Sequence, residues 1–83
     1  MPLFMDQHTL PGPVSTEEVA QAHAADLATQ EEFGVSYERY WVDEAEGRIF
    51  CLVEAPDPES AAAVHRKAHG LVADRIFPVA EGA

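Results

Sequence analysis

The sequence predicts an α+β domain of the ferredoxin-like type, with the element order βαββαβ, a four-stranded antiparallel sheet and both helices on one face. Three observations predict this fold. The 83 residues, 47% of them hydrophobic, suit one globular domain over residues 1–83. Two segments carry the signals that begin helices, and apolar segments of strand length flank each of them. A polar turn joins the two middle strands into a hairpin.

The first strand and the first helix are separated by a proline-rich loop. Residues 2–8 alternate loosely and indicate a strand, whereas the prolines and glycine of residues 10–13 exclude a helix. Residues 15–18, Ser-Thr-Glu-Glu, have the spacing of a capping box, which predicts that a helix begins there. We expect this helix to continue to about Phe33 and to end at Gly34. Its inner face should carry Val19, His23 and Leu27, with Asp26 and Gln30 at the margin.

The middle of the chain predicts a hairpin. Residues 35–42 are dense in aromatic and β-branched side chains, which favour a strand. The acidic, glycine-containing residues 43–47 predict a turn into a third strand, residues 48–54.

The second helix and the last strand complete the pattern. Residues 57–59, Asp-Pro-Glu, supply a cap, a proline suited to the first helical position and an acid in the first turn, and the helix should end at Gly70. Residues 71–79 predict a fourth strand whose end, near Pro78, lies at an edge, and residues 81–83 predict a tail.

The third strand also predicts a partner subunit. Both of its faces are largely apolar, and two helices on one side of the sheet leave the other side bare. An exposed apolar face of this size favours association with a second copy. We therefore expect a homodimer, a dimeric α/β barrel. The bare face should carry several of the residues Phe4, Tyr37, Trp41, Phe50 and Leu52.

Composition limits the classes of partner. The formal net charge is -10, with 15 acidic residues against 5 Lys and Arg, which disfavours nucleic acid and anionic membranes as partners. No apolar run approaches the roughly 20 residues that span a bilayer, and no apolar leader opens the chain, so we expect a cytoplasmic protein. The one cysteine, Cys51, cannot form an internal disulfide and should be a free thiol.

The residues that carry chemistry point to a metal site. His65 and His69 lie four residues apart on the second predicted helix and therefore project from one face. Imidazole and thiolate together suit nickel, zinc or copper. Arg66 stands where metalloprotease helices carry a glutamate, which disfavours zinc peptidase chemistry. The candidate ligands are His23, Cys51, His65 and His69, followed by His8, Asp26, Asp6 and Glu54.

Each candidate also has a structural interpretation. His23 suits a hydrogen-bonded, half-buried histidine, and Cys51 suits a small core side chain. His69 suits a partner of the helix dipole in the last turn. These alternatives leave the metal site open on chemistry alone.

A set of short motifs adds a resemblance. The chain resembles the small bacterial nickel-binding, ferredoxin-like family, which is largely catalogued as a domain of unknown function, from Met5 to about Val79. The resemblance implies a ferredoxin-like subunit in a dimeric barrel, and nickel binding in at least one relative. The motifs that carry it are Phe4-Met5-Asp6-x-His8, His23-x-x-Asp26-Leu27, Gly34-Val35, Trp41, Phe50-Cys51-Leu52-x-Glu54-Ala55-Pro56 and His65-x-x-x-His69-Gly70.

Three functional hypotheses follow. The first is a homodimer that binds nickel or a similar divalent ion for storage, sequestration or sensing, with no catalytic residue required. The second is a small dimeric α/β-barrel enzyme that acts on a small organic substrate, such as a monooxygenase or an isomerase. The third is an interaction module whose acidic surface binds a basic partner.

Overall fold

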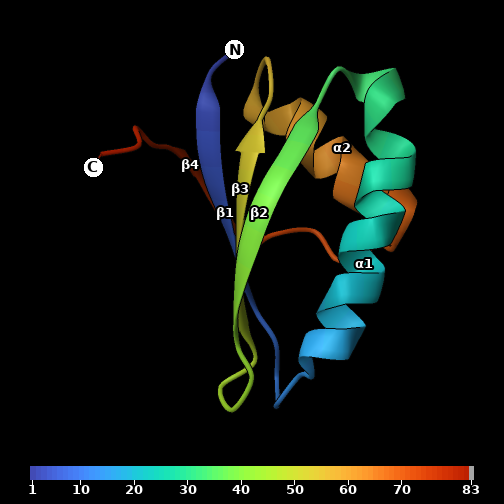
Figure 1. Ribbon diagram of the computed structural model, residues 1–83, viewed down its shortest axis with the longest axis vertical. Helices are drawn as coiled ribbons and strands as arrows, with labels where there is room; N and C mark the ends of the chain where they lie inside the picture. The colour runs from blue at the N-terminus through green and yellow to red at the C-terminus, as the bar shows by residue number, and fades with distance from the viewer. Residues whose placement is uncertain (83) are drawn as a thin grey trace.

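The computed structural model describes residues 1–82 and confirms the α+β element order. All strand pairs are antiparallel, and the order across the sheet is β2-β3-β1-β4. Figure 1 shows both α-helices on the same side of this sheet. The elements are β1 (Leu3–Thr9), α1 (Thr16–Thr29), the 3-10 helix η1 (Gln30–Phe33), β2 (Ser36–Asp43), β3 (Arg48–Glu54), α2 (Pro58–Ala68) and β4 (Arg75–Pro78).

Helix α1 begins and ends where the sequence predicted, but it faces the core differently. Ser15 and Glu18 form the capping box, and η1 carries the helix on to Gly34, which is left-handed with φ 65°. The prediction that Leu27 lies on the inner face was wrong, because its side chain is 47% exposed. Asp26, expected at the margin, is only 2% exposed, because it faces His65 of α2 and His69, which follows this helix.

The central strands β1 and β3 place polar residues in the interior. Asp6 pairs with Cys51, and His8 pairs with Ile49, in the antiparallel register. Alternate residues of a strand share a face, so Asp6 and His8 both point toward the helices. The residues of β1 and β3 that are buried on that side are Phe4, Asp6, His8, Ile49, Cys51 and Val53.

Strand β2 contains an irregularity that changes which side chains face the helices. The register shifts between Tyr37 and Arg39, so both Tyr37 and Tyr40 lie on the helix side. Regular alternation would have placed Tyr37 with Trp41, which is the arrangement that the sequence predicted. Tyr37, which was expected on the bare face, is therefore buried under the helices. Phe4, also expected on the bare face, is buried under the helices as well, because it alternates along β1 with Asp6 and His8.

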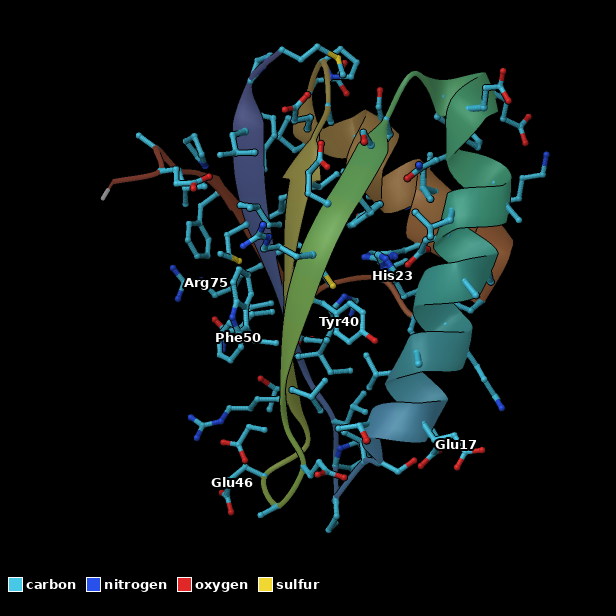
Figure 2. All side chains as sticks on the ribbon, in the orientation of Figure 1. Glu17, His23, Tyr40, Glu46, Phe50 and Arg75 are labelled. Atoms are coloured by element: carbon cyan, nitrogen blue, oxygen red, sulfur yellow. The ribbon has the colours of Figure 1, made fainter. Side chains whose placement is uncertain are left out.

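The sheet face opposite the helices is called the open face below. Trp41 pairs with Phe50 on this face, and its side chain is 48% exposed. Figure 2 shows Phe50 and Arg75 on this side, whereas Tyr40 and His23 lie between the sheet and α1. Three of the five predicted residues, Trp41, Phe50 and Leu52, are thus on the open face.

The last strand is shorter than predicted, because residues 71–74 form a loop. Gly70 has φ 84° and turns the chain away from α2. The backbone N–H of Asp74 donates to Gln7 O over 2.9 Å, and its carboxylate accepts from the backbone N–H of Thr9 over 2.6 Å. These bonds fix the α2–β4 loop, defined here as residues 69–74, beside the end of β1.

Two further predictions concern the whole chain. Within residues 1–82 neither α-helix combines the length and the apolar character needed to cross a bilayer. Ala83, the end of the predicted tail, lies outside the described residues.

A glycine in the β2–β3 turn tests how tightly this turn packs on the loop before α1. Gly47 has φ 67°, and a Cβ there would lie 2.1 Å from the backbone oxygen of Gly12. We expect Gly47→Ala to lower the free energy of unfolding by about 1–3 kcal/mol, the usual range for local backbone strain. Urea unfolding measures this change. Gly12→Ala is the control, because a Cβ there meets nothing within 4 Å. Equal stability of the two variants would contradict the prediction.

Candidate metal centre

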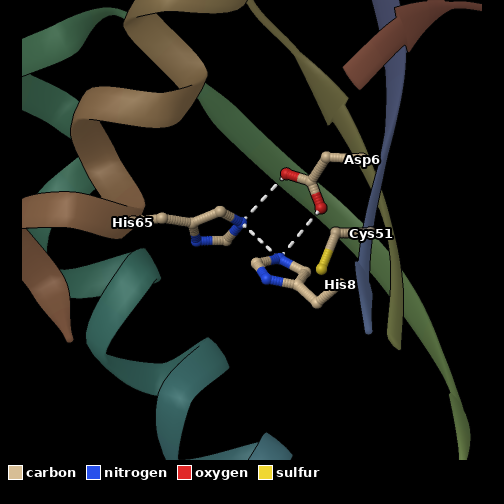
Figure 3. A group of neighbouring side chains, drawn as sticks. All are labelled: Asp6, His8, Cys51 and His65. Atoms are coloured by element: carbon tan, nitrogen blue, oxygen red, sulfur yellow. Dashed lines mark hydrogen bonds and ion pairs between the residues drawn. The ribbon is translucent and has the colours of Figure 1, made fainter. Parts of the chain in front are cut away.

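Two overlapping groups of potential ligands lie between the sheet and the helices. The inner cluster consists of Asp6, His8, Cys51 and His65, all buried (Figure 3). The outer cluster consists of Asp26, His65 and His69. In each cluster one ligand atom per residue lies within 4.8 Å of the others, and His65 belongs to both.

Secondary structure explains why the inner cluster comes together. Asp6 and His8 are two residues apart on β1, and Cys51 lies opposite Asp6 on β3, so the sheet presents all three on one face. His65 reaches them from α2. Ala61, one turn earlier on that helix, is fully buried, and its backbone oxygen accepts from the Tyr37 hydroxyl of β2 over 3.1 Å.

The inner cluster is compact. The Nε2 atom of His65 lies 2.9 Å from Asp6 Oδ2 and 3.4 Å from His8 Nε2. The Nε2 atom of His8 lies 3.3 Å from the other carboxylate oxygen, Asp6 Oδ1. The Tyr37 hydroxyl donates to Asp6 Oδ2 over 2.8 Å and is also 3.1 Å from Ala61 O. The carboxylate of Asp6 is therefore held between two imidazoles and a phenol.

The charges of these groups depend on one another. Burial alone would raise the pKa of Asp6, but the hydrogen bond from His65 and the nearby His8 hold it well below its usual range. Burial alone would lower the pKa of His65, but its contacts with Asp26 and Asp6 raise it to about 9. At neutral pH the ion-free protein therefore buries an imidazolium between two carboxylates.

The thiol and the phenol of the site are neutral in the same state. Burial, followed by the charge of Asp6, raises the pKa of the Cys51 thiol and of the Tyr37 hydroxyl far above their usual ranges. A buried thiol of this kind is inert as a nucleophile. A metal ion that takes Cys51 as a ligand must displace its proton.

One buried atom bears directly on whether the cluster fits a cation. Asp6 Oδ1 makes no hydrogen bond, because the His8 contact at 3.3 Å is an ion-pair contact without hydrogen-bond alignment. An unsatisfied buried acceptor costs about 1–3 kcal/mol. Ligand atoms that share one ion through bonds of about 2.1 Å lie about 3.0–3.4 Å from one another. The contacts among Asp6, His8 and His65, 2.9–3.4 Å, are close to this spacing. Two imidazoles, a carboxylate and a thiol therefore fit a borderline divalent ion.

The outer cluster surrounds Asp26. Its Oδ1 atom lies 2.9 Å from His65 Nδ1 and 3.0 Å from His69 Nε2, and these two nitrogens are 3.2 Å apart. The other nitrogen of His69, Nδ1, accepts the backbone N–H of Leu71 over 3.1 Å. Burial lowers the pKa of His69, against the opposing effect of Asp26.

Six of the eight candidate ligands predicted from the sequence lie in these clusters. His8, which the sequence placed at a strand end, is in the centre and only 5% exposed. His23 belongs to neither cluster; its ring packs against Tyr40 at 4.8 Å between centroids. Glu54 also belongs to neither, because it ends β3 on the side of the open face. Tyr37 was not predicted as part of the site, because the irregularity in β2 leaves no mark in the sequence.

A small cavity adjoins both clusters. Its volume is about 30 Å³, and residues of both clusters line it together with His23 and Tyr40. A water molecule needs about 10–15 Å³ by this measure, so the cavity has room for about two.

Comparisons with known proteins agree with this chemistry. The sequence model of the family described as nickel responsive protein SCO4226-like matches residues 4–79. The crystal structure of SCO4226 from Streptomyces coelicolor A3(2) is similar, with a TM-score of 0.89 and 40% sequence identity. The alignment covers 98% of this chain and 99% of that chain. No curated protein sequence matches the chain.

The raised pKa of His65 predicts how the stability of the ion-free protein depends on pH. The folded pKa of about 9 exceeds the usual value of 6.5, so the contribution of His65 is complete below pH 6.5 and is lost as pH rises through 9. The loss should be on the order of 3 kcal/mol. His69 acts in the opposite direction, but only below its usual value of 6.5.

Urea unfolding between pH 7 and 9, in the presence of a chelator, measures this loss. Asp26→Asn is the comparison, because it removes one of the two carboxylates that raise the pKa of His65. The variant should be less stable at pH 7, and its stability should change less with pH. A wild-type stability that is constant from pH 7 to 9 would contradict the assignment of an imidazolium.

Proposed function

This chain belongs to the SCO4226-like family of nickel-responsive proteins, and from that premise we propose that it binds nickel, or a similar divalent ion such as zinc or copper, at the inner cluster. The biological role is storage, sequestration or sensing of the ion. The observation that carries the proposal is the convergence of Asp6, His8 and His65 on one point around a buried carboxylate oxygen without a hydrogen bond.

Each residue of the inner cluster has a role in this proposal. The Nε2 atoms of His8 and His65, the carboxylate of Asp6 and the thiolate of Cys51 hold the ion. Tyr37 donates to Asp6 Oδ2 and so orients the carboxylate. Binding of the ion removes one proton from His65 and one from Cys51. The charge of the ion then replaces these protons beside the buried carboxylates.

The enzymatic alternative receives less support from the geometry. The cavity beside the inner cluster, about 30 Å³, is far smaller than the roughly 300–1,000 Å³ of typical small-molecule sites. A larger groove of about 390 Å³ adjoins it and shares His69 and Leu71, but no residue of the inner cluster lines this groove. An organic substrate in the groove would not touch the inner cluster.

The open face supports the proposal of a homodimer. Trp41 is half exposed there, and a hollow of about 340 Å³ beside it is lined mainly by apolar side chains. Packing two such faces together removes this apolar surface from water and produces a dimeric α/β barrel. The residues that line the hollow are Leu3, Met5, Arg39, Trp41, Leu52, Val79, Ala80 and Glu81.

Calorimetric titration with nickel tests the metal site. We expect binding of micromolar affinity or tighter, and a loss of more than about 100-fold in affinity for His8→Ala and Cys51→Ser, because each removes a ligand. His23→Ala and Glu54→Gln are the controls, because neither residue belongs to a cluster. Full affinity in His8→Ala, or an equal loss in the controls, would contradict the assignment. Circular dichroism verifies that each variant is folded.

Sedimentation equilibrium tests the dimer. Trp41→Asp places a charge on the open face and should convert the protein to a monomer of 9.0 kDa. Leu27→Asp is a matched control, because Leu27 is exposed to nearly the same extent, 47% against 48%, but lies on α1. A dimeric Trp41→Asp variant, or a wild-type monomer, would show that the open face is not the interface.

A further inference from the structure

We propose that Asp26 and His69 are positioning residues, which make His65 present its Nε2 atom to the ion, and that the outer cluster is not a second metal site. This inference rests on the proposed function. It is carried by a chain of three polar contacts, two of them hydrogen bonds. Leu71 N–H donates to His69, His69 Nε2 makes an ion-pair contact with Asp26 at 3.0 Å, and Asp26 accepts from His65.

The first bond determines the tautomer of His69. A backbone N–H only donates, so the Nδ1 atom of His69, 3.1 Å from the nitrogen of Leu71, must carry a lone pair. A ring with a lone pair on one nitrogen is neutral, so the proton of His69 is on Nε2, which lies 3.0 Å from Asp26 Oδ1 and 3.2 Å from His65 Nδ1. A protonated nitrogen cannot bind a metal ion. To act as a ligand in the outer cluster through Nε2, His69 would have to lose its bond to Leu71.

The next bond determines which nitrogen of His65 is free. Asp26 Oδ1 also accepts from His65 Nδ1 over 2.9 Å, and a carboxylate only accepts, so the Nδ1 atom carries a proton. When His65 loses its second proton, the lone pair is left on Nε2. That atom lies 2.9 Å from Asp6 and 3.4 Å from His8, within the inner cluster. A carboxylate on the far nitrogen also makes an imidazole a stronger ligand.

Because His65 belongs to both clusters, the two clusters cannot each hold an ion with His65 as a ligand. A neutral imidazole has one lone pair, and Asp26 holds the proton of the other nitrogen in place. The outer cluster therefore serves the inner cluster. This role also accounts for the burial of Asp26, which with Val19 is one of the two buried residues of α1 and contacts two histidines.

The contacts that run from Leu71 through His69 and Asp26 to His65 connect the proposed metal site with the α2–β4 loop. One end of the loop is held by the Leu71–His69 bond, and the other end by Asp74, which accepts from the backbone N–H of Thr9 next to His8. A change at His69 therefore acts on the ion through the orientation of Asp26 and His65, without removal of a ligand.

The test compares His69→Ala and His69→Gln with the wild type. Nickel affinity is measured by calorimetry, and the number of imidazole ligands is measured by X-ray absorption on the nickel-loaded proteins. We expect His69→Ala to weaken binding by about 10–100-fold. His69→Gln should recover most of this loss, because its amide N–H can donate to Asp26. The imidazole count should be two in all three proteins.

A second measurement needs no metal. Nitrogen-15 NMR of the ion-free wild type at pH 7.5 should show His69 as the neutral tautomer with its proton on Nε2. A proton on Nδ1 would overturn the proposal. Equal losses of affinity in both variants, together with loss of one imidazole ligand, would identify His69 as a ligand and also overturn it. A wild type that binds no nickel would instead defeat the proposed function, so the two failures are distinguishable.

Discussion

The imidazole of His65, held between the carboxylates of Asp6 and Asp26, is the interaction on which the arrangement of this protein depends. It joins β1, α1 and α2, and each of its nitrogens lies 2.9 Å from a carboxylate oxygen. All three residues are at most 2% exposed. Removal of one partner from a buried ion pair typically costs about 3–5 kcal/mol, because the remaining charge stays buried and unpaired. Such a site in an 83-residue domain takes up interior volume that apolar side chains would otherwise fill, which favours a functional reason for it.

The charge of the interior explains why a cation suits this site. Two carboxylates and one imidazolium leave a net negative charge beneath the helices, and the whole chain carries a formal charge of -10. A divalent ion supplies the missing positive charge at the place where Asp6 Oδ1 has no hydrogen bond. The neutral thiol of Cys51 contributes no charge until the ion displaces its proton. The groups that join the sheet to the helices without an ion are therefore the same groups that the proposed function assigns as its ligands.

The features that the sequence predicted correctly are the local ones. The capping box at Ser15, the left-handed Gly34 and the β2–β3 hairpin depend on residues close together in the chain. Six of the eight candidate ligands, which their residue types had marked, lie in the two clusters, and their role as ligands stays a prediction. The features that were wrong depend on distant contacts. Asp26 is turned inward by His65 of α2 and by His69 in the loop after it. A register shift in β2, which no residue type marks, moves Tyr37 to the helix side. The central position of His8 depends on β1 lying between two other strands.

The division of ligands among the elements links metal binding to folding. Asp6, His8 and Cys51 belong to two paired strands, so their relative positions are set by the sheet alone. His65 belongs to α2, and an ion at the inner cluster therefore ties this helix to the sheet. An ion at 100 times its dissociation constant adds about 2.7 kcal/mol to the stability of the state that binds it. Small domains are stable by only about 5–15 kcal/mol, so this is a substantial fraction. Under the proposed function, occupancy of the inner cluster would change how firmly α2 and the loop after it are held, and this would give the domain a physical means of responding to the ion.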